Sequence, residues 1–561
     1  MPKILQKTLT IIVFTSRNFK VILILKNGEE EIFLSVERKS FKDTGIRLLK
    51  KGQKGIVHAI FSRFGIIILL FFLQAILLLA GLIWFQSFMS ELFFGGLALG
   101  LFVSIYILNT QSDPSAKLTW IILVMALPVF GTLLYLYTEF EVGHRSLRDR
   151  IEKLVDSTKE KIPQEPEVIE AFREKDKGAA AIAKYLQRTG CFPVFDRTAV
   201  LYFPLGEDFF ETLLTELKKA RHFIFLEYFI IDEGIMWGKI LEILAEKVKE
   251  GVDVRVIYDG TNEFTTLPRN YPELLKNLGI KCKVFAPLSP FVSTHYNYRD
   301  HRKIMVIDGN TAFTGGINFA DRYINRETVH GHWKDTAVML KGKAVKGFTL
   351  MFLQMWNISE KEEKFDPYLS FPTLPPEDTK GFVIPYGDCP LDRDKVGEMV
   401  YIDILNRAKN YVHIMTPYLI LDGEMETAIR FAAERGVEVK IILPGVPDKL
   451  APYSLAKSHY SALMDSGVQI YEYKPGFIHA KSFVADDVEA VVGTINLDYR
   501  SLYHHFECAA YCYKTACIAD IEKDFQETLE KSIGITKKTI WKNYPWLRPV
   551  SFFVKIIAPL L

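Results

Sequence analysis

The sequence predicts an α/β protein built from two similar halves, preceded by a region of apolar helices that would span a membrane. A His-x-Lys-x4-Asp motif occurs twice, at residues 301–308 and 479–486, and each copy leads into a glycine turn that ends in an Asn. The same order of strand-like and helix-like segments recurs around each copy. Long uncharged apolar segments precede the first half. These observations indicate a duplicated unit with a paired site, held at a membrane.

The bulk composition limits the classes of protein to consider. A chain of 561 residues is too long for one domain, so roughly two or three are expected. Its hydrophobic content of 49% is high for a wholly soluble protein, and its net charge of +2 gives no global basic field that would indicate a nucleic-acid partner. The six cysteines form no Cys-x-x-Cys pair and lack partners at zinc-ligand spacing, so buried free thiols are expected.

The N-terminal part of the chain divides into an extension and an apolar region. Residues 1–60 contain short strand-type runs and a basic stretch, with no apolar core typical of a signal peptide, and we assign them no function. Region 61–138 holds three apolar segments, at about 65–85, 92–108 and 118–137. Their length and lack of charge favour membrane spans over buried helices. Basic residues flank both ends of the region, which three full spans cannot satisfy, so either one segment is re-entrant or one basic cluster does not decide the topology.

The rest of the chain is predicted to form two globular halves with charged or proline-rich connections. Residues 139–178 are charged and helical in pattern, which is typical of a connector next to a membrane. The halves are predicted at 179–356 and 381–535, and the proline-rich and charged stretch 357–380 is predicted to link them. Residues 536–561 mix aromatic and basic residues, which suits either an interfacial segment or a helix packed on the domain.

Each half repeats a strand, a helix and further strands before its motif. In the first half the pattern predicts a strand at 222–228, a helix at 238–250, and strands at 251–257 and 278–284. The matching segments of the second half are 411–418, 424–435, 436–442 and 466–471. Strands and helices that alternate in this way, with β-branched runs, are typical of an α/β layer fold with a largely parallel core.

The motif residues are suited to phosphoryl chemistry. Residues two apart in a strand face the same way, so His301 and Lys303 are expected to share one face, as are His479 and Lys481. A Lys ammonium can hold a phosphate oxygen while the neighbouring imidazole attacks phosphorus. An Asn after each glycine turn can donate to the same phosphate. Two facing units would therefore surround one phosphoryl group with two His, two Lys and two Asn, without a metal.

Each half also carries a later acid that could bind the outer nitrogen of an imidazole, fixing its tautomer. The acid of the first half, Asp335, is predicted to pair with His301 of the same half. The Asp residues of the motifs are predicted to close a strand turn by local hydrogen bonds, with an indirect role. The remaining histidines are interpreted as structural, except that His504 and His505 could border the site near the second acid. The candidate catalytic residues are His301, Lys303, Asp308, His479, Lys481 and Asp486, and the supporting ones are Asn318, Asn496, Asp335 and Glu507.

Over residues 65–561 the sequence resembles the phospholipase D superfamily and, within it, the bacterial cardiolipin synthases. The resemblance rests on both motifs, on the membrane segment 112–131, on Met415-Thr416-Pro417-Tyr418 and on the stretch 493–507. It implies two pseudo-symmetric phospholipase D-like α/β repeats behind an N-terminal transmembrane region, a multi-pass location in the cell membrane, and no cofactor or metal. The third apolar segment departs from members with two spans.

The resemblance also implies a reaction. One motif histidine would attack the phosphorus of phosphatidylglycerol and form a phosphatidyl-histidine, and the other would protonate the departing glycerol and then activate the hydroxyl of a second phosphatidylglycerol. By analogy His301 would be the nucleophile and His479 the acid and base, although the sequence treats them almost alike. The product would be cardiolipin. The partner is phosphatidylglycerol in the membrane, with no nucleic acid, and no oligomer is needed to complete the site.

Other functions use the same residues. A phospholipase D-type hydrolase, or a phosphatidyltransferase with another alcohol acceptor, would differ only in the acceptor pocket. A nuclease of the same superfamily is disfavoured by the apolar segments and by the lack of a strongly basic surface. A non-enzymatic membrane scaffold would leave two intact motifs without a purpose.

Overall fold

A computed structural model describes residues 8–12, 22–27, 30–35, 72–76, 89–111, 113–139, 142–287, 298–374, 376, 379–392 and 394–558. The chain separates into two compact units, of which the first comprises residues 1–76 with a short piece of a later loop. Its strands β1 (Thr8–Ile12), β2 (Ile22–Asn27) and β3 (Glu30–Ser35) form an antiparallel sheet in the order β1-β2-β3. The short strand-type runs of the sequence, at 10–14 and 21–25, overlap β1 and β2 respectively.

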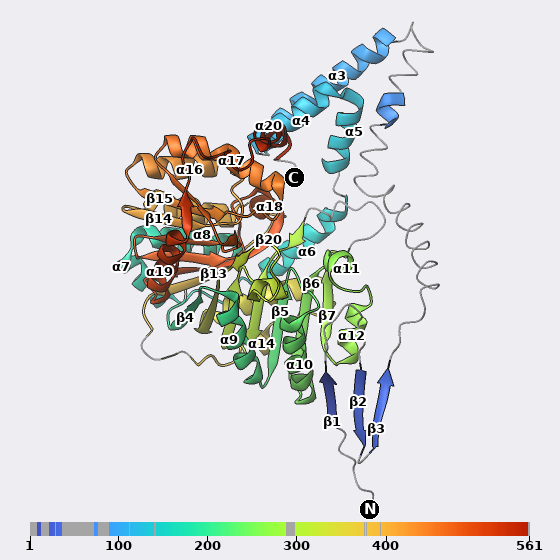
Figure 1. The fold of residues 1–561 in the computed structure, drawn as a ribbon, viewed down its shortest axis with the longest axis vertical. Coiled ribbons are helices and arrows are strands. Elements are labelled where there is room, and N and C mark those ends of the chain that lie inside the picture. The colour runs from blue at the N-terminus through green and yellow to red at the C-terminus, as the bar shows by residue number, and fades with distance from the viewer. Residues whose placement is uncertain are drawn as a thin grey trace, which may run out of the picture. The chain divides into compact units, whose positions relative to one another are not determined.

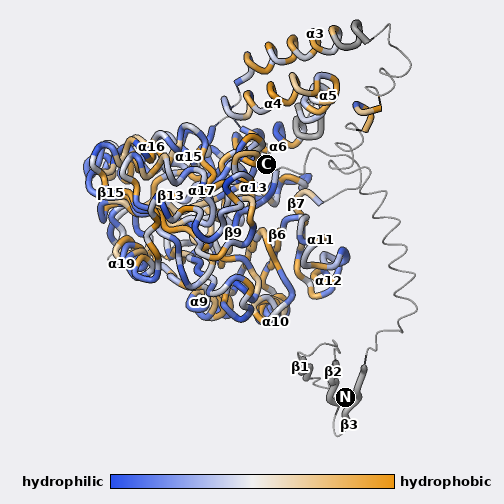
Figure 2. The backbone as a smooth tube through the Cα atoms, turned by 45° about the horizontal axis from the view of Figure 1, so that its top comes forward, coloured by the Kyte–Doolittle hydropathy of each residue, from blue (hydrophilic) through white to orange (hydrophobic). Residues whose placement is uncertain are grey.

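The second unit begins with the apolar helices α3 (Met89–Leu108), α4 (Pro114–Ala126) and α5 (Pro128–Glu139), which pack on one another. Figure 2 shows α3 as hydrophobic along most of its length. In the part of the chain that the structure describes, no helix has both the length and the apolar character needed to cross a membrane. The predicted span 92–108 lies within α3, and the predicted span 65–85 lies outside the described residues except at 72–76.

The prediction of one continuous helix over 118–137 is wrong. Helix α4 ends at Ala126 with Leu127 as its C-cap, since Pro128 has no N–H to continue the hydrogen-bond ladder. The chain then reverses, and a Cβ placed on Gly131 would lie only 2.6 Å from the backbone oxygen of Leu123. Only a glycine allows this close approach, so α4 and α5 form a tight helical hairpin.

Two mixed sheets form the centre of the second unit (Figure 1). In the first sheet the strand order is β4-β12-β10-β9-β5-β6-β7, and in the second it is β13-β20-β19-β18-β14-β15-β16-β21. The strands of the first sheet are β4 (Thr198–Phe203), β5 (Phe223–Tyr228), β6 (Asp253–Asp259), β7 (Lys281–Phe285), β9 (Lys303–Ile307), β10 (Thr311–Gly315) and β12 (Ala337–Gly342). Those of the second are β13 (Phe382–Asp388), β14 (Tyr411–Met415), β15 (Glu438–Pro444), β16 (Gln469–Tyr473), β18 (Ser482–Ala485), β19 (Glu489–Gly493), β20 (His505–Tyr513) and β21 (Ser532–Gly534).

The pairings of the two sheets correspond strand by strand, with β21 as an addition to the second. The three strands β5, β6 and β7 are parallel to one another, as are β14, β15 and β16. All the other neighbours in the first sheet are antiparallel, and so are their counterparts in the second. The expected largely parallel core is therefore wrong. The strand–helix–strand repeat predicts the parallel strands β5 to β7 and β14 to β16. The strand that begins at or just after each motif lysine, β9 or β18, runs antiparallel to them.

Helices cover the sheets and join them. In the first half these are α9 (Gly206–Lys218), α10 (Ile235–Lys249), α11 (Asn262–Thr265), α12 (Tyr271–Asn277), η2 (Asp321–Ile324), α13 (Val345–Asn357) and, after it, α14 (Asp366–Leu369). In the second half they are α15 (Val396–Arg407), α16 (Gly423–Glu434), α17 (Leu450–Asp465), α18 (Tyr499–Tyr503) and α19 (Cys517–Glu530). Almost every residue of α13 is buried, because it packs on its own sheet and also on β13. In the same way α19 packs on its own sheet and on β4, so each half lends a helix to the other.

The segments predicted as connector and linker are folded onto this core where they are described. The connector contains α6 (Val142–Thr158) and α7 (Pro166–Lys175), and α8 (Lys177–Gly190) begins at its end. On α6, Arg150 donates to the backbone oxygens of Asn357 and Glu360 and to the carboxylate of Glu363, in the linker. At the other end of the chain, α20 (Leu547–Ile557) packs on α17, and its Ile556 oxygen accepts from Thr119 of α4 at 2.7 Å (Figure 1). The apolar helices are thereby attached to the second half.

Candidate active site

Two short parallel strand pairs cross between the halves and hold both motif histidines. Strand β8 (Arg299–Asp300) pairs with the start of β20, and β11 (His332–Lys334) pairs with β17 (Gly476–Ile478). Directly after each pair, the histidine N–H donates to a backbone oxygen of the opposite half: His301 to Phe506 at 2.9 Å, and His479 to Lys334 at 2.7 Å. Each histidine therefore lies beside the acid-bearing strand of the other half.

In the first half-site, Nδ1 of His301 lies 2.9 Å from each carboxylate oxygen of Glu507. Glu507 is fully buried, and it also accepts a short hydrogen bond from the hydroxyl of Thr494. The ring of His505 lies 5.2 Å from that of His301, with its Nδ1 3.4 Å from Glu507. Glu507 is therefore a fixed acceptor that selects the Nδ1–H tautomer of His301 and leaves Nε2 with its lone pair.

In the second half-site, Nδ1 of His479 lies 2.6 Å from Oδ2 of Asp335. The other oxygen of this buried carboxylate accepts from the N–H of Thr336 at 2.8 Å. A second difference from the first half-site is the motif lysine: the ammonium of Lys481 lies 2.8 Å from the same ring nitrogen of His479. The pairing of imidazole with carboxylate is thus repeated, with a different charge environment.

The predicted pairing of His301 with Asp335 is wrong, because the acids are exchanged between the halves. Asp335 and Glu507 occupy matching positions in the two halves. Each lies two residues before an alanine, and that alanine pairs with the glycine that ends the preceding strand, β10 or β19. A buried carboxylate does lie at Nδ1 of each motif histidine. Sequence order suggests pairing within a half, whereas the bridging strands bring the opposite half closer.

The motif lysines lie at or near the starts of their strands. Lys303 is the first residue of β9, and Lys481 directly precedes β18, so neither histidine belongs to the strand itself. Each ammonium bonds to the backbone oxygen of its own motif histidine, at 2.5 Å for Lys303 and His301. Each lysine side chain is therefore folded back onto the backbone of its own motif histidine, in the same way in both halves.

Burial dominates the electrostatics of the site. It lowers the pKa of His301 and the pKa of His479 well below their ordinary values, so both rings are neutral at pH 7. Burial also lowers the pKa of Lys303 to about 8 and the pKa of Lys481 to about 7. Lys303 contributes to lowering the pKa of His479 in the other half. A charge of one half-site therefore acts on the histidine of the other.

The two carboxylates differ. Burial would raise the pKa of Glu507, but His301 and His505 outweigh it and hold that pKa well below its usual range. For Asp335, burial raises the pKa to about 7, although Lys481 opposes the rise. The first half-site therefore pairs a neutral imidazole with a fully ionised acid, whereas the second holds a proton that is easily exchanged.

The two predicted asparagines line the loops that follow the glycine turns. Asn318 accepts from the N–H of Ile230 at 3.0 Å and donates to the hydroxyl of Tyr323 at 2.8 Å. Asn496 donates to Asp498 at 3.2 Å, while its buried side-chain oxygen has no hydrogen-bond partner. Both amides order the loops around the site, and phosphate binding by them stays a prediction.

Each motif aspartate directly follows the motif strand, at the end away from the histidine. Asp308 accepts three backbone N–H groups at 2.8 Å, from residues 221–223 at the start of β5. Asp486 accepts three from residues 409–411 at the start of β14, at 2.7–2.8 Å. Both have positive φ, of 50° and 53°. These bonds reach a distant strand rather than a local turn, so the predicted local closure is wrong while the indirect role is supported.

Sequence reasoning missed several residues of the site. Thr494 binds Glu507, and the aromatic rings of Phe229 and Tyr323 lie 5.0 Å from His301 and 5.5 Å from His479 respectively. His505 was predicted to border the site, and it lies beside His301 and Glu507, because a His two residues before Glu507 faces the same way on a strand. The aromatic contacts carry no pattern in the sequence.

One group of ligand atoms at the site has a geometry that could hold a metal. His301, His505 and Glu507 each offer an atom within 4.8 Å of the others. The same atoms already serve the imidazole–carboxylate pairing, and the ammonium of Lys303 acts on His301 as a repulsive charge. This donor set fits a proton-sharing cluster better than a cation site, and a reaction without metal stays a prediction.

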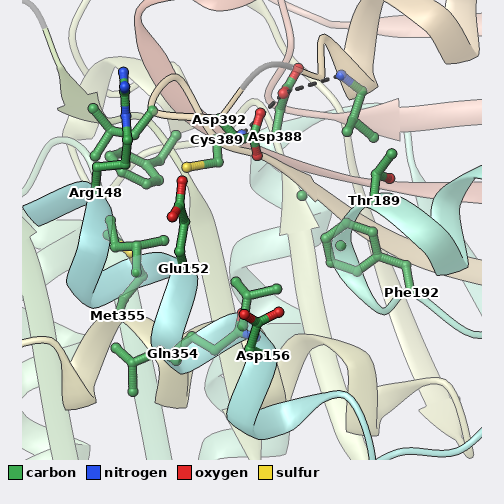
Figure 3. Close-up of a pocket in the computed structure, with 18 of the residues that line it drawn as sticks. Arg148, Glu152, Asp156, Thr189, Phe192, Gln354, Met355, Asp388, Cys389 and Asp392 are labelled. Atoms are coloured by element: carbon green, nitrogen blue, oxygen red, sulfur yellow. Dashed lines mark hydrogen bonds between the residues drawn. The ribbon is translucent and has the colours of Figure 1, made fainter. Parts of the chain in front are cut away.

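A cavity of ≈ 280 Å³ lies behind the site (Figure 3). Its lining includes Arg302 and Phe506, the neighbours of His301 and Glu507, together with Asp388 and residues of α6. Side chains of adjacent residues in extended chain point to opposite faces. The cavity therefore opens on the face away from the imidazole–carboxylate pair, and we do not assign the reacting lipid to it.

Comparisons with known proteins agree with this architecture. A family model described as "Cardiolipin synthase, PLD-like domain" matches residues 213–356 and 401–529, and one described as "Phospholipase_D-nuclease N-terminal" matches residues 98–137. A solved phosphatidylserine synthase from Haemophilus influenzae has the same fold, with a TM-score of 0.51 at 12% identity, over 68% of this chain and 100% of that one.

Sequence relatives give a closer likeness. A Streptococcus mutans protein named only as uncharacterized is 54% identical, over 82% of this chain and 99% of its own length. A cardiolipin synthase of Alkalihalophilus pseudofirmus is 32% identical, over 82% of this chain and 92% of its own length. The chain belongs to the cardiolipin synthase family of phospholipase D-like proteins. Membership of this family, with the shared fold, makes it an enzyme of the phosphatidyltransferase class.

Replacing Asp308 or Asp486 by Ala tests the role of the motif aspartates. Each variant removes three hydrogen bonds to a carboxylate, so the free energy of unfolding should fall by about 2–3 kcal/mol. Denaturant unfolding in detergent measures this loss. The exposed Glu242 on α10 gives the control Glu242→Ala, which should change the stability little. A stable but inactive Asp308→Ala protein would contradict a structural role.

Proposed function

We propose that the chain is a cardiolipin synthase that transfers a phosphatidyl group between two phosphatidylglycerol molecules, giving cardiolipin and glycerol. The observation that carries the proposal is the crossed pairing of two neutral imidazoles with two buried carboxylates, each beside a motif lysine. Membership of the family supports the choice of lipid substrate. Each half-site supplies one imidazole, and the reaction needs two.

The reaction proceeds in two displacements. In the first, Nε2 of one histidine attacks phosphorus, the P–N bond forms and the bond from phosphorus to the glycerol oxygen breaks. The second histidine gives its Nε2 proton to that oxygen while it takes the proton of its buried acid at Nδ1. In the second, that histidine takes the proton from a hydroxyl of another phosphatidylglycerol, whose oxygen attacks phosphorus as the P–N bond breaks. Lys303 and Lys481 stabilise the negative charge on the equatorial oxygens.

We assign His301 as the nucleophile and His479 as the acid and base. The ionised Glu507 contacts the His301 ring with both oxygens, which favours a ring with a free lone pair at Nε2 and stabilises the positive charge that develops on attack. His479 shares its Nδ1 with an acid whose pKa burial raises to about 7, which suits a group that gains and loses a proton in each cycle.

We further propose that the enzyme works at the cell membrane, where both substrates reside, as a multi-pass protein. The apolar residues 65–85 and the helices α3, α4 and α5 would provide the membrane contact, and the α4–α5 hairpin is too short to span and would be re-entrant. The basic residues on both flanks of the apolar region would place both of its ends, and with them the catalytic unit, on the cytoplasmic side.

The first test is product analysis with labelled phosphatidylglycerol and the variants His301→Ala and His479→Ala. Wild type should release cardiolipin and glycerol in the presence of a chelator. Each variant should lose at least about 10³-fold in kcat, and the double variant should be no worse, because the histidines act as one unit. His222→Ala, an exposed histidine outside the site, is the control. Release of phosphatidic acid alone would instead identify a hydrolase.

The lysine pKa values predict the pH dependence of substrate binding. In the free enzyme the positive charges are lost as pH rises through about 7 for Lys481 and about 8 for Lys303. A phosphodiester keeps its negative charge throughout, so KM should begin to rise above about pH 7 and should rise more steeply above about pH 8. The bound anion stabilises both ammonium groups, so kcat should hold to higher pH. A KM that is flat from pH 6.5 to 9.5 would contradict this account; Lys303→Arg, which stays charged, should flatten the rise.

The C-terminal helix α20 is proposed as a second contact with the lipid surface. Phe552 and Phe553 are 69% and 68% exposed, and α20 is bonded to α4 of the apolar hairpin. Replacing both by Ser should raise KM for lipid in vesicles roughly tenfold or more and leave kcat unchanged, because each buried Phe stabilises binding by about 2 kcal/mol. Phe431→Ser, on α16, is the matched exposed control. Equal effects of both changes would argue against a lipid contact.

A further inference from the structure

The two half-sites are supported by different kinds of residue. Glu227 pairs with Ile304 in β5 and β9, and the matching position of β14 is Met415, which pairs with Ser482. Counting back from the motif histidines, Asp300 corresponds to Ile478, and Arg302 corresponds to Ala480. Two acids and a base beside the first histidine are therefore replaced by three apolar residues beside the second.

In the first half these three side chains form a buried cluster of ionisable groups. Arg302 is 6% exposed, and Glu227 and Asp300 are fully buried. One guanidinium nitrogen of Arg302 lies 3.8 Å from Glu227, and the backbone N–H of Arg302 donates to Asp300 at 3.2 Å. Burial and the neighbouring Asp300 raise the pKa of Glu227 well above its ordinary value, and Arg302 is the positive charge that opposes this rise for both acids.

Arg302 also reaches the catalytic acid. Its Nε donates to the backbone oxygen of Glu507 at 3.2 Å, and its guanidinium lies 5.6 Å from the centre of the Phe506 ring. Phe506 in turn accepts the backbone bond from His301. Arg302 thereby contacts the residue that carries the acid and the residue that accepts from the His301 backbone. Its side chain lines the cavity on the other face and contacts no reacting atom.

In the second half an apolar cluster fills the positions that correspond to these three residues. Met415, Ile478 and Ala480 pack with Ile442, Tyr473 and Phe525. A well-packed apolar core is usually at least as stable as a buried ion cluster of the same volume, because the ions lose their hydration. The second half demonstrates that the fold accepts the apolar solution. The charged solution in the first half therefore needs an explanation other than stability.

We propose that Arg302, held by Glu227 and Asp300, is a positioning residue that fixes the Glu507–His301 pair and makes the first half-site the more constrained of the two. The inference rests on the proposed transfer reaction and deepens it. It assigns the constraint to the half-site whose histidine must keep one ring orientation while the P–N bond forms. His479, which only moves a proton, has no such cluster behind it. A small misplacement of an attacking group can slow a reaction about a hundredfold, so positioning matters most for His301.

The test converts the first cluster into the second. The triple variant Glu227→Met/Asp300→Ile/Arg302→Ala replaces all three residues by their counterparts and leaves no unpaired charge. We expect a folded protein in which the rate of phosphatidyl-enzyme formation, followed in single turnover, falls about tenfold or more while KM changes less than about twofold. The matched control, Met415→Leu/Ile478→Val, alters the second cluster conservatively and should leave both quantities within about twofold of wild type.

A second variant covers the case in which the triple variant fails to fold. Arg302→Lys keeps the charge but cannot hold Glu507 and the two acids at once, so the same loss of rate is expected. Hydrogen exchange of residues 299–303 and 505–508 without lipid should be faster in both variants. An unchanged rate of enzyme labelling in either folded variant overturns the inference. A wild-type protein that transfers no phosphatidyl group overturns the proposed function instead, and unaltered exchange in the variants would then refute positioning separately.

Discussion

The structure depends on the exchange of carboxylates between its two halves. His301 is held by Glu507 of the second half, and His479 by Asp335 of the first. Each pair therefore takes its imidazole from one half and its carboxylate from the other. The short parallel pairings β8–β20 and β11–β17 make the exchange possible, because each sets a histidine beside the strand that carries the opposite acid. The chain therefore gains its site only when both halves are folded and docked.

Several features of the fold serve that docking. The helices α13 and α19 each pack on both sheets, and one hydrophobic core contains residues of both halves, such as Phe225 and Ile414. Lys334 bonds to Asp524 of α19 at 2.7 Å, and Asp524 in turn accepts from Tyr202 at 2.6 Å. These buried contacts run through the same interface as the crossed pairs. Displacing the halves would therefore separate the histidines from their acids.

The sequence could predict what is repeated but not what is exchanged. The strands around 222–228 and 411–418, and the helices after them, are found as β5, β14, α10 and α16 within a few residues, because hydrophobic patterning within a segment determines them. The pairing of Asp335 with His479 could not be found in this way, since it depends on how two complete halves dock. The break at Pro128 was visible in the sequence, whereas the reversal that packs Gly131 on Leu123 was not.

The Asp that ends each motif connects the sequence motif with the packing of the sheet. It lies five residues beyond the lysine, and at about 3.3 Å per residue this places it roughly 16 Å from the chemistry. Its carboxylate binds the first N–H groups of the central strand, β5 or β14, which is antiparallel to the motif strand. The bond therefore fixes the register between the two strands, and a one-residue slip would turn the motif lysine to the other face of the sheet. In each motif, the His and Lys lie at the reactive end, while the Asp at the far end aligns the strand that presents them.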